Sequence, residues 1–167
     1  MATIHLGGNP VRTQGVFPAP GHLAPNFTLI GTDLQPVSLA DYRGKTVVLN
    51  IFPNVDTSVC DTSVCKFNQA AGERPGTHVL CISKDLPFAH KRFCEAEGLD
   101  HVVGLSDFRS PHFSSDYGIL LEDGPLAGLT ARAVVVVNDK CEVVHSEMVN
   151  EIGEEPNYEA ALNAVIA

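Results

Sequence analysis

Basic side chains are scarce in this sequence, and this limits the kinds of partner that the protein can bind. The 167 residues include 11 lysines and arginines against 20 aspartates and glutamates, which gives a formal net charge of −9. A protein that binds nucleic acid needs a surface of lysine and arginine to neutralise phosphates. We therefore expect no nucleic-acid partner.

Long apolar runs are also absent. No stretch reaches the roughly 20 residues that a membrane-spanning helix needs, and residues 1–8 contain no basic segment followed by an apolar one, as a secretory leader would. We expect no membrane attachment and a cytoplasmic location. With 44% hydrophobic and 19% charged residues, the chain suits one globular domain over residues 1–167.

Cysteine is present, but not in the spacing of a disulfide framework or a zinc site. The five cysteines are widely spread, and the sequence contains no Cys-x-x-Cys or His-x-x-x-His pair. On one helix, Cys60 and Cys65 would lie about 140° apart around the axis and about 7.5 Å apart along it, which suits neither a shared metal nor a disulfide. We expect no metal or cofactor, and one or two working thiols in a reducing compartment.

The first candidate for a working thiol is Cys60, at the junction of a strand and a helix. Residues 46–52 are rich in β-branched side chains and stop at Pro53, which is typical of a buried strand. Apolar residues at helical spacing then predict a helix that is capped by Asp56 or Thr57. Cys60 would lie in the first turn of this helix.

The position of Cys60 favours a reactive thiol. The first turn of a helix carries free backbone N–H groups and the positive end of the helix dipole, and both stabilise the thiolate, which is the nucleophilic form of cysteine. The apolar face of the helix also directs Cys60 toward the sheet rather than toward water. A buried and inert cysteine is the competing interpretation, and helix position alone does not decide between the two.

The remaining pattern predicts strands that alternate with helices. Such alternation gives parallel strands joined by right-handed crossovers, and a βαβ unit followed by a β-hairpin and a helix is the thioredoxin-like arrangement. We therefore predict an α/β fold with a central mixed sheet flanked by helices and an N-terminal β-hairpin. The predicted elements are a hairpin within residues 1–22, strands at 26–30, 78–83, 101–105, 132–137 and 142–147, and helices at 87–98 and 158–166, with an acidic, solvated loop at 151–156.

A second candidate thiol, Cys94, falls in the predicted helix at 87–98. The apolar side chains of that helix, from Phe88 to Ala96, fill an arc of about 140°, and Cys94 falls about 100° outside it. A free thiol away from the buried face is a liability unless it is used, so a redox role is favoured. Cys81 lies in mid-strand between apolar neighbours and is interpreted as core packing.

The pattern Pro-x-x-x-Thr-x-x-Cys, here Pro53, Thr57 and Cys60, resembles the active-site signature of peroxiredoxins. The wider pattern is similar to that of the bacterial thiol peroxidases, the peroxiredoxin branch that uses two cysteines of one chain. The matching segments are residues 50–53, 56–60, 80–83, 85–89, 92–94, 123–126 and 131–135. Cys65 and Cys141 do not belong to the pattern of that family.

The resemblance implies roles for five residues. Cys60 would be the peroxidatic nucleophile and Cys94 the resolving thiol. Arg132 opens an apolar strand, where an arginine ordinarily keeps its head in water, but the resemblance implies that it reaches the thiolate and the peroxide. A fixed positive charge there would stabilise the thiolate and the departing oxygen. Thr57 would hydrogen-bond the thiolate or the peroxide, and Pro53 would exclude water from the reacting atoms.

We therefore predict a thiol peroxidase that reduces hydrogen peroxide and organic hydroperoxides in antioxidant defence. Cys60 would become a sulfenic acid and then form an intramolecular disulfide with Cys94. The resemblance implies that thioredoxin reduces this disulfide by thiol–disulfide exchange, and that the protein is a homodimer. Two alternatives keep the fold: a redox sensor whose Cys60–Cys94 pair signals rather than clears peroxide, and a purely structural thioredoxin-like module.

Overall fold

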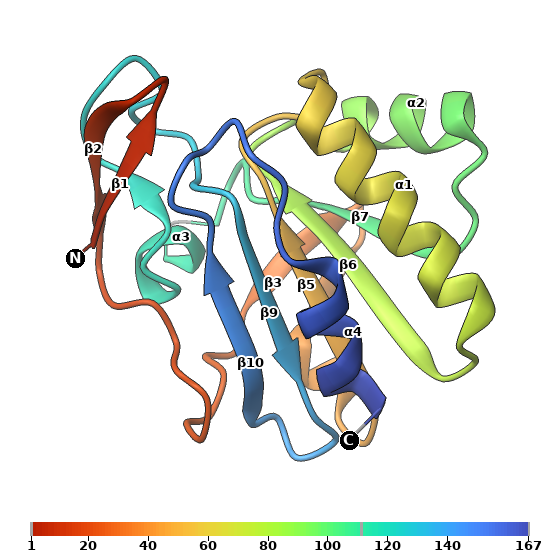
Figure 1. Cartoon of the computed structure of the whole chain (residues 1–167). Coiled ribbons are helices and arrows are strands. Elements are labelled where there is room, and N and C mark those ends of the chain that lie inside the picture. Colours follow the sequence, from red (N-terminus) through yellow and green to blue (C-terminus); the bar gives the residue numbers. More distant parts are fainter. Residues whose placement is uncertain (1, 111, 167) are drawn as a thin grey trace.

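Within residues 2–110 and 112–166, the computed structural model contains a seven-stranded mixed sheet, a separate three-stranded sheet and four α-helices (Figure 1). The strands are β1 (Ala2–Leu6), β2 (Asn9–Gln14), β3 (Thr28–Gly31), β4 (Pro36–Ser38), β5 (Thr46–Ile51), β6 (Thr77–Ser83), β7 (Val102–Ser106), β8 (Leu120–Leu121), β9 (Ala133–Val137) and β10 (Val143–Met148). The helices are α1 (Ser58–Glu73), α2 (Pro87–Glu97), α3 (Phe113–Asp116) and α4 (Tyr158–Ile166), with a 3-10 helix at Leu39–Tyr42. No helix in this described part of the chain is long and apolar enough to cross a membrane.

The seven-stranded sheet has the strand order β10-β9-β5-β6-β7-β3-β4. The strands β5, β6 and β7 are parallel, and α1 and α2 connect them in turn. β9 pairs antiparallel with β5, and β10 pairs antiparallel with β9. β5 and β9 are almost entirely buried because elements cover both faces of the sheet. The predicted βαβ unit, β-hairpin and final helix are confirmed.

The central strands contribute side chains to two separate cores. Val48, Cys81 and Val134 point to one face, where they pack with residues of α1, α2 and α4. Leu49 and Val135 point to the other face, where they pack with residues of α3 and the N-terminal hairpin. This division follows from the alternation of side chains along a strand. The helices α1 and α2 (Figure 1) therefore pack on the same side of the sheet, and both candidate thiols belong to the core on that side.

Four short elements, namely β4, the 3-10 helix, α3 and β8, are not predicted by the sequence. β8 pairs with Thr13 and Gln14 of β2, so the N-terminal hairpin belongs to a three-stranded sheet of its own. Elements of two to four residues are too short to show a hydrophobic period. These elements are defined by tertiary contacts with other strands and loops, which the local sequence does not show.

Residues 151–156 form a loop in which residues 153–155 are exposed, as predicted, but Ile152 and Pro156 are buried. Ile152 is 3% exposed, and its N–H donates to the carbonyl of His5 at 2.9 Å. The Glu151 carboxylate accepts hydrogen bonds from both glycine N–H groups of the hairpin turn, at 2.9 and 3.1 Å. These bonds hold the pKa of the Glu151 carboxyl below its ordinary value. The segment therefore fastens the N-terminal hairpin to the end of β10.

Candidate active site

Cys60 is the third residue of α1 and lies on the inner side of the first helical turn. Thr57 occupies the cap position, with the extended backbone that a cap residue adopts. The Cys60 side chain has no exposed surface and belongs to the same core as Val64 and Phe67, which follow it on the inward face of α1. The predicted orientation of Cys60 toward the sheet is confirmed.

A buried arginine faces the Cys60 sulfur. Arg132 stands directly before β9, is 2% exposed, and places Nη1 3.2 Å from Cys60 Sγ. Its Nε donates a hydrogen bond of 2.8 Å to the carbonyl of Ile152, and its own carbonyl accepts one of 2.9 Å from the Val149 N–H. The Ile152 carbonyl thus holds the guanidinium, and the Val149 N–H holds the backbone of Arg132. A cation in this position stabilises negative charge on the sulfur.

Pro53 and Thr57 border the turn that leads into α1. Pro53 follows β5 and is buried. Thr57 is exposed, and its hydroxyl donates to the carbonyl of Asn54 at 3.2 Å instead of capping the helix. The prediction of a side-chain cap at the start of α1 is therefore wrong, because the tight turn brings the Asn54 carbonyl within reach of the hydroxyl.

Three further residues near Arg132 are not singled out by the sequence. Tyr158, at the start of α4, donates its hydroxyl to Glu155 at 2.9 Å. Lys66 of α1 lies 3.3 Å from the Glu155 carboxylate and 4.7 Å from the centre of the Tyr158 ring. Burial and the bond to Glu155 raise the pKa of Tyr158, and the charge of Arg132 opposes this rise. These contacts tie α4 to α1, and a shallow pocket of about 360 Å³ beside them is lined by Val59, Thr62, Gly153, Glu154 and Glu155.

Asp85 ties the turn before α1 to the turn before α2. Its Oδ1 accepts a hydrogen bond of 2.8 Å from Asn54 Nδ2, and its Oδ2 accepts one of 2.9 Å from the Val55 N–H. The Ser83 hydroxyl also donates to Oδ2, at 2.5 Å. One carboxylate therefore joins the segments that lead into the helices of Cys60 and Cys94.

His90 is the buried end of this network. Its Nε2 lies 2.9 Å from Ser83 Oγ, and because the single hydroxyl proton of Ser83 goes to Asp85, Nε2 must carry the proton in this pair. The His90 ring lies 6.2 Å from the Phe52 ring. Gly104 leaves room for it, since a Cβ at that glycine would lie 2.9 Å from the His90 Cβ. Burial lowers the pKa of His90 to about 4, and the nearby Asp85 carboxylate opposes this shift.

The structure corrects the orientation of Cys94. The buried residues of α2 are Pro87 and His90, whereas Phe88 is 65% exposed. Cys94 follows His90 by one turn, is half-buried, and lines a cleft of about 280 Å³ between α2 and β7. The prediction that Cys94 lies away from the buried face is wrong, because a histidine rather than an apolar residue occupies the centre of that face. Burial raises the pKa of the Cys94 thiol.

All five cysteines are free thiols, and among the described contacts only Cys60 has an arginine within hydrogen-bond distance. Cys81 is buried in β6, as predicted, and burial raises its pKa. Cys65 is half-buried in α1 and donates to Asp61 at 3.4 Å. Burial and this bond raise the pKa of Cys65 to about 11. Asp61, Cys65 and Glu97 place possible metal-ligating atoms within 4.8 Å of one another.

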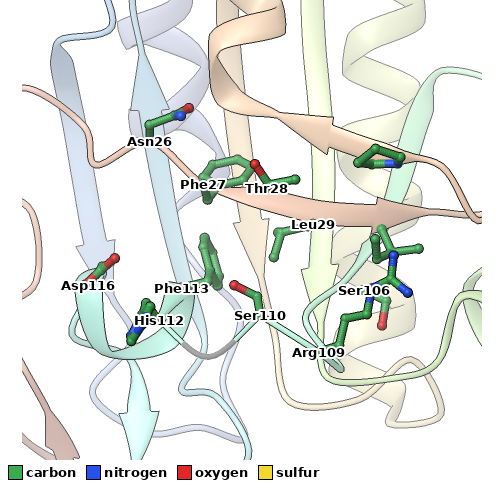
Figure 2. A pocket seen from close by; sticks show the side chains of 12 residues that line it. Asn26, Phe27, Thr28, Leu29, Ser106, Arg109, Ser110, His112, Phe113 and Asp116 are labelled. Carbon is green, nitrogen blue, oxygen red and sulfur yellow. The ribbon is translucent and has the colours of Figure 1, made fainter.

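A pocket of about 440 Å³ lies on the other side of the sheet (Figure 2). Figure 2 shows Phe27 and Leu29 on one side of it, and Arg109 and His112 from the segment after β7 on the other. Phe27 and Leu29 belong to the core that does not contain Cys60. The lining residues are Asn26, Phe27, Thr28, Leu29, Ile30, Pro36, Ser106, Arg109, Ser110, His112, Phe113 and Asp116. This pocket is therefore separate from the site around Cys60.

Comparison with known proteins finds relatives over the whole chain. A sequence model of the Redoxin family matches residues 19–162. The chain is 54% identical over 165 residues to proteins named thiol peroxidase from Mycobacterium bovis and Mycobacterium tuberculosis, with 99% of each chain covered.

Solved structures with the same fold include a peroxiredoxin-like protein from Aquifex aeolicus, at 37% identity and a TM-score of 0.94, with 99% of this chain and 96% of that chain covered. A thiol peroxidase from Chromobacterium violaceum is 20% identical with a TM-score of 0.90, and the match covers 98% of this chain and 95% of that chain. These similarities confirm the predicted fold class.

We predict that His90 makes the protein less stable as the pH falls below about 6.5. The folded state lowers the pKa of His90 from 6.5 to about 4, so the fold prefers neutral histidine and the unfolded chain takes up the proton first. The contribution is complete above pH 6.5 and is lost as the pH falls toward 4. Between pH 7.5 and pH 5.5 it should remove about 1.4 kcal/mol from the free energy of unfolding, measured by urea denaturation.

The prediction is checked by replacing His90 and measuring again how the free energy of unfolding changes with pH. In His90→Gln, whose amide can still donate to Ser83, the change in stability between the two pH values should shrink by about that amount. His22→Gln, at an exposed position, should leave the slope as it is. An equal slope in His90→Gln and the original protein would contradict the prediction.

Proposed function

The chain belongs to the Redoxin family and reduces peroxides by a thiol-based mechanism, and from this premise we propose that Cys60 is the thiol that reacts. The observation that supports this is the 3.2 Å contact between Arg132 Nη1 and the fully buried Cys60 sulfur. The thiols of Cys65, Cys81 and Cys94 have raised pKa values and remain protonated at neutral pH. The thiolate is the nucleophile, so these three are poorly suited to the first step.

In the proposed first step, the Cys60 thiolate attacks the terminal oxygen of the hydroperoxide. The O–O bond breaks, the sulfur becomes a sulfenic acid, and the remaining oxygen leaves with the electron pair and takes up a proton from solvent. Arg132 stabilises the thiolate before the attack and the negative charge on the departing oxygen during it. Arginine suits this task because it stays charged throughout. Water or an alcohol is released.

Pro53 and Thr57 complete the proposed site. Pro53 is buried beside the first turn of α1 and keeps water away from the reacting atoms. The Thr57 hydroxyl donates to the carbonyl of Asn54 in this structure, so we propose that rotation about its side-chain bond turns it toward the incoming peroxide. A hydroxyl can donate one hydrogen bond and accept two, which suits a hydroperoxide, because this ligand carries a donating O–H group and accepting oxygen atoms.

Cys94 is the proposed resolving thiol. Its attack on the Cys60 sulfenic acid releases water and forms the Cys60–Cys94 disulfide. Cys60 is completely buried under the first turn of α1, whereas Cys94 lines a cleft between α2 and β7. We therefore propose that the turn before α1, the segment around Cys94, or both must move before the sulfurs meet.

An external dithiol then restores both cysteines by thiol–disulfide exchange, in which two electrons pass to the disulfide and the donor becomes the new disulfide. We propose thioredoxin for this role, a homodimer as the assembly, and the cytoplasm as the location. The five free thiols of the structure suit a reducing compartment. The proposed substrates are hydrogen peroxide and organic hydroperoxides.

The proposal is tested by Cys60→Ser, with Cys65→Ser on the same helix as the matched control. A serine hydroxyl is not ionised at neutral pH, so we expect Cys60→Ser to abolish peroxide consumption in the presence of thioredoxin and its reductase. Cys65→Ser should keep its activity within about twofold of the original protein, because burial and the Asp61 carboxylate keep the Cys65 thiol protonated. Turnover by Cys60→Ser would remove Cys60 from the role of nucleophile.

Arg132→Gln should lower the rate constant for oxidation of Cys60 by about 10²-fold, the loss that follows removal of one oxyanion donor. The rate is measured by quenched-flow alkylation and mass spectrometry. Arg74→Gln is the control, because Arg74 also donates to a backbone carbonyl, that of Leu162 at 3.2 Å, but faces no thiol. An Arg132→Gln rate equal to that of the control would argue against electrostatic catalysis by Arg132.

Cys94→Ser should still undergo rapid oxidation at Cys60 but should not complete a catalytic cycle. Without the resolving thiol, the sulfenic acid persists and a second peroxide drives it to the irreversible sulfinic acid. Intact mass spectrometry after a peroxide pulse should show two added oxygens and no internal disulfide, whereas Cys141→Ser should still form the disulfide. An internal disulfide in Cys94→Ser would mean that Cys65, Cys81 or Cys141 resolves the sulfenic acid.

A further inference from the structure

Asp85 takes part in five hydrogen bonds, three through its side chain and two through its backbone. Its two carboxylate oxygens accept from Asn54 Nδ2, from the Val55 N–H and from Ser83 Oγ, at 2.8, 2.9 and 2.5 Å. Its backbone adds two more links, since its N–H donates to Ser83 Oγ at 3.1 Å and its carbonyl accepts from the Ser106 hydroxyl. Asp85 is therefore fixed to the ends of β6 and β7 while its side chain holds the turn that precedes α1.

The turn that Asp85 holds is the one that positions Cys60. Asn54 and Val55 lie between Pro53 and Thr57, and the Val55 side chain is buried. The Val55 N–H has a carboxylate as its acceptor, and hydrogen bonds to an ionised acceptor are roughly twice as strong as neutral ones. When Asp85 holds this turn, the first helical turn of α1 keeps its place against Arg132.

Asp85 also lies two positions before Pro87, the first residue of α2. One side chain thus bridges the segments that lead to the two cysteines of the proposed cycle. A second link between these segments, the ion pair of Arg92 with Asp56 at 3.1 Å, has side chains that are 65% and 68% exposed. Exposed pairs of this kind contribute little, so Asp85 is the stronger of the two links.

We propose that Asp85 is a positioning residue that holds the turn at residues 54–57 and thereby sets how fast oxidised Cys60 reaches Cys94. This inference rests on the proposed function, in which the Cys60 sulfenic acid and the Cys94 thiol condense to a disulfide with release of water. The turn must leave its place for that step, and the two hydrogen bonds that Asp85 accepts from Asn54 and Val55 resist the departure. They prolong the life of the sulfenic acid, during which a second peroxide can oxidise it further.

Asp85→Asn is the main test, because it keeps the size of the side chain and removes its charge. An amide offers one acceptor and one donor group where the carboxylate offers two acceptors, so either Asn54 Nδ2 or the Val55 N–H then faces a donor. We expect disulfide formation to become about tenfold faster, which is the effect of losing one hydrogen bond to a charged group. The first oxidation of Cys60 should instead become slower, by up to about threefold, because Pro53 and Thr57 are held less firmly.

The two steps are followed by acid quenching, thiol alkylation and mass spectrometry, since the chain contains no tryptophan to report them by fluorescence. The peroxide concentration that converts half of the Cys60 thiols to sulfinic acid is measured in parallel and should rise about tenfold in Asp85→Asn. Opposite changes in the two steps are the signature of a positioning role. A variant that was merely damaged would lose both.

Asp123→Asn is the matched control. Asp123 also accepts a backbone N–H and a side-chain N–H, from Arg12 at 2.7 and 3.1 Å, but it serves the N-terminal hairpin. Both rates in Asp123→Asn should stay within about twofold of the original protein. If Asp85→Asn does not fold, Asn54→Ala removes one of the three side-chain hydrogen bonds and should accelerate disulfide formation about threefold.

The outcomes separate this inference from the proposed function. If the original protein forms no Cys60–Cys94 disulfide, the proposed function fails. If that disulfide forms, but at an unchanged or lower rate in Asp85→Asn, or in Asn54→Ala where Asp85→Asn does not fold, the positioning role of Asp85 is overturned and the proposed function stands. Equal acceleration in Asp123→Asn would also overturn it, because the effect would then reflect general loosening of the fold.

Discussion

The structure depends on one buried charge, the Arg132 guanidinium that lies 3.2 Å from the Cys60 sulfur. Removing a guanidinium from water is costly unless it is paired and hydrogen-bonded, and several elements serve that need. The carbonyl of Ile152 accepts from Nε, and the Ile152 N–H is in turn bound to the carbonyl of His5. A continuous line of contacts therefore runs from the sulfur through Arg132 to the first strand of the protein. The N-terminal hairpin, far from Cys60 in the sequence, braces the charge that the thiol needs.

The same arrangement supports our proposal that Cys60, among five thiols, is the one that is oxidised. Burial raises the pKa of Cys65, Cys81 and Cys94, and for Cys65 the Asp61 carboxylate raises it further. An unpaired thiolate in these places would have lost its hydration without gaining a cation. Only the Cys60 sulfur has lost its contact with water and gained a positive charge in its place. In our proposal, selectivity depends on the position of the single buried arginine among the described residues, Arg132.

The hydrophobic pattern of the sequence correctly predicted those elements that depend on neighbouring residues alone. The strand that ends at Pro53, the inward position of Cys60 and the final helix over residues 158–166 all follow from hydrophobic period and breakers. The orientation of Cys94 could not be predicted, because the centre of the buried face of α2 is His90, a polar residue that pairs with Ser83 and fits against a glycine of β7.

Contacts between distant segments could not be predicted from the sequence pattern, because that pattern describes only residues that are close along the chain. Asp85 meets Val55 across 30 positions, and Glu151 meets the hairpin turn across 144. That second separation has a consequence for synthesis of the chain. The Ile152 carbonyl that accepts from Arg132 belongs to a residue whose N–H is bound to His5, so a nascent chain that already carries Cys60 lacks these contacts of Arg132 until residue 152 has emerged. Contacts this distant form late. Cys60 is therefore synthesised 72 positions before Arg132, the cation that we propose activates it, and it lacks this partner while the segment between them is made.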